Sequence, residues 1–223
     1  MSNYKTVFFI LGVLQIILGL SMIVPIMAQF YYNQVDSGFI GSGLVSIIFG
    51  VLFFLSNLDY EKKLTLPQAF LLTALSWLSI AIFGSLPFVF SDLSLSFTNA
   101  FFESMSGITT TGSTILTNLN ETPKAILLWR AMLQWLGGIG IIVMAITLMP
   151  IMNIGGMQLF VISNTHTPEK ILPKSKEISI RLIAIYSSLT LVCAFFYKIF
   201  GMSFFDSIVH SMTTIATLSL IHI

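Results

Sequence analysis

Long apolar stretches separated by short polar segments run through most of the chain. A helix needs about 20 mostly apolar residues to cross a bilayer, and five stretches reach or nearly reach that length. They are residues 7–27, 39–55, 68–90, 125–149 and 180–200. The first follows Lys5 as a signal peptide would, but it is long enough to span and no small-residue cleavage site comes after it. The pattern predicts an all-α membrane protein with five spanning helices.

The segment between the third and fourth stretches has a different pattern. Residues 97–105 suit a helix too short to cross, and residues 106–114 carry hydroxyls and glycines but no charge. A short helix followed by an extended polar strand, with both ends on one side, is the pattern of a pore loop. Irregular backbone at membrane depth is tolerated only where it is buried in protein or lines water. The alternative is an external loop that is rich in Thr and Ser.

The polar strand offers neutral oxygen ligands for a cation. The carbonyls and hydroxyls of Thr109, Thr110 and Thr111 could replace an ion's hydration shell. Gly112 can adopt backbone angles closed to other residues, so that neighbouring carbonyls face one path. Uncharged ligands suit a monovalent ion, whereas a divalent ion favours carboxylates. We therefore expect a selectivity filter for a monovalent cation at Thr109, Thr110, Thr111 and Gly112.

This arrangement is repeated along the chain. Residues 203–212 follow the fifth stretch as residues 96–105 follow the third, and both segments begin Ser-Phe, end Ser-Met and run into Thr-rich chain. Internal repeats commonly build symmetric pathways through membranes, and a pore ringed by filter strands needs about four of them. The chain holds one complete helix–pore loop–helix unit and the beginning of a second.

Composition and charge narrow the classes of protein. Hydrophobic residues make up 56% of the chain and charged residues 9%, against about 25% charged in a soluble domain, so the lipid bilayer is the expected surrounding. A net charge of +1 excludes a nucleic-acid partner. Most Lys and Arg residues near helix ends lie on the same side of the membrane as the N-terminus. The positive-inside rule places that side in the cytoplasm. These residues are Lys5, Lys62, Lys63, Lys170, Lys174, Lys176 and Arg181, against Lys124 and Lys198 on the other side.

Three runs resemble a known family: SMSGITTTG at 104–112, WRAMLQWLGGIG at 129–140 and HSMTTIAT at 210–217. They are similar to the Trk/Ktr/HKT potassium transporter superfamily, and most of all to its bacterial TrkH-type uptake subunits. The resemblance implies four units around a central pore, with potassium selected by one glycine in each filter. Here that glycine is Gly112, with the backbone carbonyls of Thr110, Thr111 and Gly112 as potassium ligands and Thr217 in the second filter. Members with Ser at the glycine tend to admit sodium.

The resemblance also implies the setting of the protein. It implies the bacterial plasma (inner) membrane, a homodimer, a cytoplasmic nucleotide-binding ring of TrkA type, and no cofactor besides the transported potassium. The expected organisation is a helix pair at 1–67, the first unit at 68–152, a cytoplasmic loop at 153–179 and the start of the second unit at 180–217. The family pattern expects Gly-Gly after Thr217, but Leu218 follows. We expect residues 218–223, which match a reading frame of a transposon-end sequencing adaptor, to be an artefact joined to an N-terminal fragment of the gene.

A buried charge is expected beside the first pore loop. Arg130 lies roughly 9 Å into the fourth helix at 1.5 Å per residue, and Glu103 on the short helix is the opposite charge at similar depth. Intramembrane charges usually mark a function or a partner, so we expect Arg130 to support the pore loop through Glu103 or the backbone. The alternative is that Arg130 extends to the outer interface. Gly137, Gly138 and Gly140 fit close helix packing, or a bend below the filter.

Three function classes compete for this sequence. A potassium-translocating, channel-like uptake subunit fits the repeated pore loops. A secondary carrier of another small solute could use a broken helix as its binding site, but it would favour inverted repeats. An intramembrane enzyme needs a nucleophile–base pair or a metal cluster within the spans, and the sequence offers no such pattern, so we expect no catalytic residue.

Overall fold

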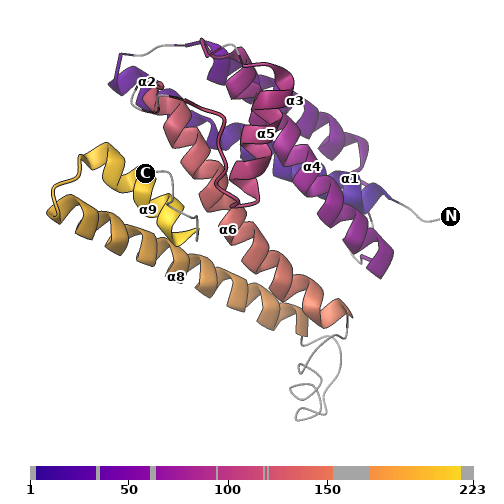
Figure 1. Ribbon diagram of the computed structural model, residues 1–223. Coiled ribbons are helices and arrows are strands. Elements are labelled where there is room, and N and C mark those ends of the chain that lie inside the picture. Colours follow the sequence, from indigo (N-terminus) through magenta and orange to yellow (C-terminus); the bar gives the residue numbers. More distant parts are fainter. Residues whose placement is uncertain are drawn as a thin grey trace.

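The chain folds into helices joined by short connections (Figure 1). A computed structural model describes residues 4–33, 36–60, 64–93, 95–117, 119, 121–152 and 171–216. Within these residues the elements are α1 (Lys5–Ser21), α2 (Ile23–Tyr31), α3 (Gly38–Ser56), α4 (Leu66–Phe90), α5 (Phe97–Ile108), α6 (Lys124–Met152), α8 (Ile171–Ile199) and α9 (Phe204–Ile215). The predicted all-α class is confirmed.

Five helical segments of the described chain are long and apolar enough to cross a membrane. They are Lys5–Tyr31, Gly38–Ser56, Leu66–Phe90, Lys124–Ile142 and Glu177–Ile199. Their number agrees with the sequence pattern, but several boundaries differ from it. The first span is divided into α1 and α2 at Met22 and extends to Tyr31, and α8 begins at Ile171, ahead of the expected residue 180. Hydropathy reports only the apolar part of a helix, so it misses polar turns at the ends.

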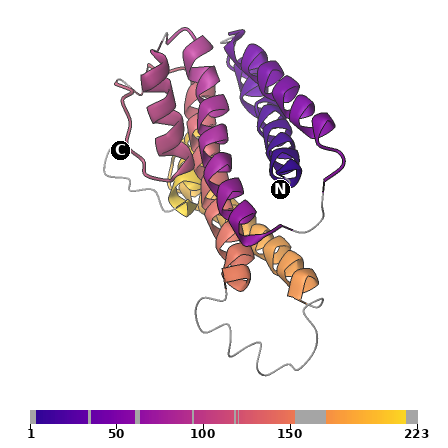
Figure 2. The same ribbon diagram turned by 90° about the vertical axis from the view of Figure 1, so that its right-hand side faces the viewer.

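Glycines bring α1 and α3 into close contact. A Cβ on Gly12 would lie 2.7 Å from the Gly50 carbonyl oxygen, and a Cβ on Gly19 would lie 2.9 Å from the Gly43 carbonyl oxygen. Small residues at such spacing let two membrane helices approach backbone to backbone. The pair then packs against α4 (Figure 2), whose other side carries α5.

The first half of α6 forms the centre of the described structure. Trp129, Ile126 and Leu133 of this helix are almost fully buried, together with Phe39 of α3 and Phe88 of α4. Figure 1 shows α6 between α3, α4 and α5 on one side and α8 and α9 on the other, with α2 beside its start. By contrast, α8 is largely uncovered, with Phe200 beyond its end 81% exposed.

A polar and aromatic contact joins α2, α6 and α9 at one end of the structure. The Tyr32 ring packs edge-on against Phe205 at 5.5 Å between centroids, and the Lys124 ammonium lies 4.1 Å from the centre of the Tyr32 ring. Burial raises the pKa of Tyr32, with smaller contributions from Tyr31 and Asp206. A cation over an aromatic face is stabilising, so the contact links the N-terminal helices to α9.

Candidate functional site

The short helix α5 and the segment after it form the candidate site. Ser96 caps α5 by accepting a hydrogen bond from the Asn99 amide at 3.3 Å. After Ile108 the chain reverses and runs back in extended form beside α6, reaching the start of α6 at the same end as the start of α5 (Figure 1). We call residues 111–117 the returning strand.

The reversal between α5 and the returning strand uses two left-handed residues. Thr110 has a φ of 55° and Gly112 a φ of 83°. Glycine adopts this region without steric cost, whereas a residue with a side chain does so rarely. The Ser106 carbonyl accepts the Thr111 amide at 3.0 Å, and the Ser106 hydroxyl donates to the Ser113 carbonyl at 2.6 Å. The last turn of α5 therefore holds both sides of the reversal.

A fully buried carboxylate fixes the middle of the returning strand. Glu103 accepts hydrogen bonds from the Thr114 hydroxyl at 2.9 Å and from the Ile115 amide at 3.1 Å. It also forms an ion pair with Arg130 of α6 through the Arg130 Nε. The carboxylate thus connects α5, the returning strand and α6.

Arg130 makes a second contact, with the backbone of the reversal. Its Nη2 donates to the Gly112 carbonyl oxygen at 3.1 Å. The side chain of Arg130 is 13% exposed and that of Glu103 is 0% exposed. The sequence anticipated Arg130 beside Glu103 or the backbone, and the structure brings it to both. The Gly112 carbonyl, an expected potassium ligand, therefore accepts a hydrogen bond from the Arg130 guanidinium.

The opposite side of the returning strand faces outward from these contacts. Thr111, Ser113 and Thr117 are exposed, whereas the residues between them are partly or fully buried. Thr109 and Thr111 share a hydroxyl–hydroxyl hydrogen bond of 2.8 Å. One face of the strand is therefore held by Glu103 and Arg130, and the other presents uncharged oxygens.

The structure brings six of the seven expected site residues together: Thr109, Thr110, Thr111, Gly112, Glu103 and Arg130. The seventh, Thr217, lies outside the described residues. Sequence reasoning did not single out Ser106 and Thr114, although both lie in the uncharged hydroxyl-rich run that it identified. Their hydroxyls satisfy backbone and carboxylate partners rather than facing outward.

Two adjacent glycines of α6 contact the ends of both short helices. A Cβ on Gly137 would collide with the Ile108 carbonyl oxygen at the end of α5. A Cβ on Gly138 would meet the Tyr186 hydroxyl of α8 and lie 3.4 Å from the Cα of Ala216, just after α9. Gly140 has open space around it in the described structure. Close packing, the simpler of the two expectations, accounts for Gly137 and Gly138.

The second short helix, α9, repeats the first in length and cap. Each has 12 residues, and the Ser203 hydroxyl accepts the Asp206 amide at 3.1 Å. His210 stands where Glu103 stands in α5 relative to the capping serine, and it is only partly buried. Near the end of α9, the hydroxyls of Thr214 and Tyr197 lie 2.9 Å apart, which ties α9 to α8.

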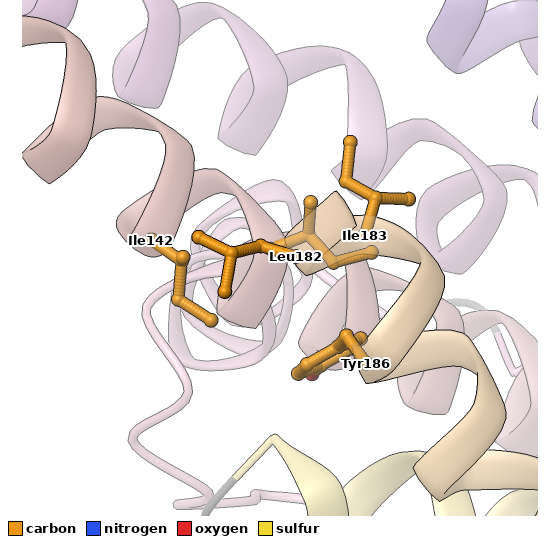
Figure 3. Close-up of a pocket in the computed structure, with 5 residues that line it drawn as sticks. Ile142, Leu182, Ile183 and Tyr186 are labelled. Carbon is orange, nitrogen blue, oxygen red and sulfur yellow. The ribbon is translucent and has the colours of Figure 1, made fainter. Parts of the chain in front are cut away.

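A small apolar cavity of about 10 Å³ lies between α6 and α8 (Figure 3). Ile139, Ile142, Leu182, Ile183 and Tyr186 line it. The volume is that of about one water molecule, and a water needs two or more polar partners. The cavity therefore offers no site for a solute, and the returning strand remains the candidate site.

Comparison with known proteins places these features in one family. A family model described as TrkH, cation transport protein, matches residues 35–220. The chain is 39% identical over 209 residues to the Trk system potassium uptake protein TrkI of Halomonas elongata, covering 93% of this chain and 42% of that protein. It is 38% identical over 218 residues to the Trk system potassium uptake protein TrkH of Vibrio parahaemolyticus, covering 96% and 45%.

A solved structure agrees with these matches. The crystal structure of the potassium transporter TrkH from Vibrio parahaemolyticus superposes with a TM-score of 0.83 at 35% identity, over 95% of this chain and 42% of that one. The chain spans less than half the length of the relatives it matches.

Proposed function

The chain belongs to the TrkH family of cation transport proteins, and we propose that the full-length protein takes up potassium through a path lined by the returning strand. The family is a transporter family and not an enzyme family, and the chain is a multi-pass membrane protein. The matched relatives are named potassium uptake proteins. The proposed transport is channel-like, with α5 and the returning strand forming a re-entrant pore loop.

One observation carries this proposal: the two faces of the returning strand differ in chemistry. The face toward α5 and α6 is held by a buried ion pair, whereas the other presents uncharged hydroxyls. Such a strand can hold a cation with neutral oxygens without moving, and neutral oxygens also let the ion leave.

Within this strand we assign selection for potassium to Gly112. Its φ of 83° lies in the left-handed region, which a Ser at this position would adopt only at a cost of roughly 1 kcal/mol or more. The Thr110 and Thr111 carbonyls are the proposed ligands in this filter, with Thr109 beside them. Thr217 is the proposed counterpart in the second filter, and Glu103 and Arg130 support the first.

The proposed setting follows from the resemblance and the charge distribution. The protein lies in the bacterial inner membrane with its N-terminus in the cytoplasm, as the positive-inside rule favours. Two copies form a dimer, and a cytoplasmic ring of TrkA type gates the pore. We expect the lysine-bearing segment 153–179 to face this ring, although its residues 153–170 lie outside the described residues.

The experiment that tests this function is growth complementation. A bacterium lacking its potassium uptake systems should grow at low external potassium when it expresses the full-length gene, and the Gly112→Ser variant should admit more sodium relative to potassium. Gly201→Ser, the same change at a glycine with a φ of 99° outside the returning strand, should keep the wild-type preference. Failure of the wild-type gene to restore growth would contradict potassium uptake and favour a secondary carrier of another solute. An unchanged ion preference in Gly112→Ser would contradict the role of the glycine alone.

A further inference from the structure

The contacts of Arg130 bear on which oxygens can bind a transported cation. Its guanidinium donates one hydrogen bond to the Gly112 carbonyl at 3.1 Å and a second to the Glu103 carboxylate. A carbonyl that already accepts a hydrogen bond from a cationic group is a poor ligand for a second cation, because the two positive charges would lie on the same oxygen. The Gly112 carbonyl is therefore committed to the protein.

We infer that Arg130 removes the Gly112 carbonyl from the set of ion ligands, and that Glu103 cancels the guanidinium charge so that the returning strand does not repel the transported cation. This inference rests on the proposed function. Gly112 then acts through its backbone conformation, and Arg130 and Glu103 are positioning residues that also set the local electrostatic balance.

The burial of the pair makes the charge balance matter for transport. The Glu103 side chain is 0% exposed and the Arg130 side chain 13% exposed, so water screens neither charge well. At an effective dielectric constant of about 20, a unit charge about 8 Å from an ion changes its binding constant more than tenfold. Loss of either partner alone leaves an uncompensated charge beside the strand, and the sign of that charge depends on which partner is lost.

Because the two uncompensated charges have opposite signs, the two single variants distinguish an electrostatic role of the pair from a purely structural one. A Glu103→Gln change keeps an oxygen that can accept the Ile115 amide, but it leaves the Arg130 charge unbalanced and should weaken potassium binding. An Arg130→Gln change leaves the Glu103 charge unbalanced and should strengthen it. If both residues only supported the strand, either change would disturb the site in the same direction.

The test is potassium uptake by the full-length protein in proteoliposomes, measured as a function of external potassium. The half-saturating concentration should rise about tenfold in Glu103→Gln, fall in Arg130→Gln, and return to within about threefold of wild type in the double variant. Glu177→Gln combined with Arg181→Gln removes an exposed ion pair of α8, whose side chains are 64% and 74% exposed. This control should leave the half-saturating concentration unchanged.

A rise in the half-saturating concentration in both single variants, with no recovery in the double variant, would overturn the inference. If Glu103→Gln does not fold, Arg130→Lys and Arg130→Gln decide, because Lys keeps the charge. The half-saturating concentration should stay near the wild-type value in Arg130→Lys and fall in Arg130→Gln. Equal half-saturating concentrations in the two variants would overturn the inference. Wild-type protein that takes up no potassium would overturn the proposed function instead.

Discussion

The two short helices α5 and α9 share their beginning and differ at their end. Each has 12 residues and a serine cap whose hydroxyl accepts the backbone amide three residues on. The end of α5 is held by its own returning strand and by α6, through Glu103 and Gly137. The end of α9 is tied to α8 through Thr214 and Tyr197. A repeated unit can thus keep one backbone frame while different side chains hold each copy in place.

The largest difference in stability is expected at equivalent positions of the two helices, Glu103 in α5 and His210 in α9. Glu103→Ala leaves the Arg130 charge buried without its partner, which typically costs 3–5 kcal/mol, while His210→Ala at a partly exposed site should cost under about 1 kcal/mol. The free energy of unfolding of the full-length protein in mixed detergent micelles measures both. Equal losses of unfolding free energy would show that His210 stabilises α9 as much as Glu103 stabilises α5.

A second contrast lies in the adjacent glycines of α6. Gly137→Ala brings a Cβ against the backbone carbonyl of Ile108, whereas Gly138→Ala meets the end of the Tyr186 side chain, which can turn away. Overpacking against backbone costs about 3 kcal/mol or more, and against a movable side chain about 1 kcal/mol.

The same unfolding measurement checks this order. Gly140→Ala serves as the control, because open space surrounds Gly140 in the described structure and alanine favours a helix by up to about 1 kcal/mol. A larger loss at Gly138 than at Gly137 would mean that α9 and α8 pack on α6 more rigidly than α5 does.

The hydroxyls near the two helix ends give a smaller effect. Ser106→Ala removes the hydrogen bond to the Ser113 carbonyl, and Thr214→Val removes the one to Tyr197. Each should cost about 1 kcal/mol. Ser106→Ala should also alter the ratio of potassium to sodium uptake, because Ser106 holds the backbone of the proposed first filter. Thr214→Val should alter this ratio less, because Thr214 holds α9 to α8 rather than a filter backbone. An equal change of ratio in both variants would indicate that the Thr214–Tyr197 contact shapes the second filter as strongly as Ser106 shapes the first.

The pattern of apolar and polar residues was enough to predict the spanning helices and the two short helices, because both depend on local sequence. The meeting of Glu103 and Arg130 was also predictable, since opposite charges at one depth in a membrane rarely stay apart. The direction of the Gly112 carbonyl was not. It depends on the left-handed angles of Thr110 and Gly112, and on a donor in α6 that is distant along the chain. The polar start of α8 at Ile171 was missed because hydropathy does not register polar helix.

The smallest expected difference in stability lies between the two capping serines, Ser96 of α5 and Ser203 of α9. Ser96→Ala and Ser203→Ala each remove an acceptor for a first-turn amide, Asn99 in one helix and Asp206 in the other, at a cost of about 1 kcal/mol. Ser203 also donates to the Asp206 carboxylate at 2.6 Å, but both groups are exposed, so this bond should add little. The two losses should therefore agree within about 0.5 kcal/mol in the unfolding measurement.

Ser→Gly changes at the same positions should cost only a few tenths of a kcal/mol, since glycine is tolerated as a cap. A clearly larger loss at Ser203 would mean that the repeat is unequal from its first turn, and that the difference between the units begins at the cap rather than at Glu103.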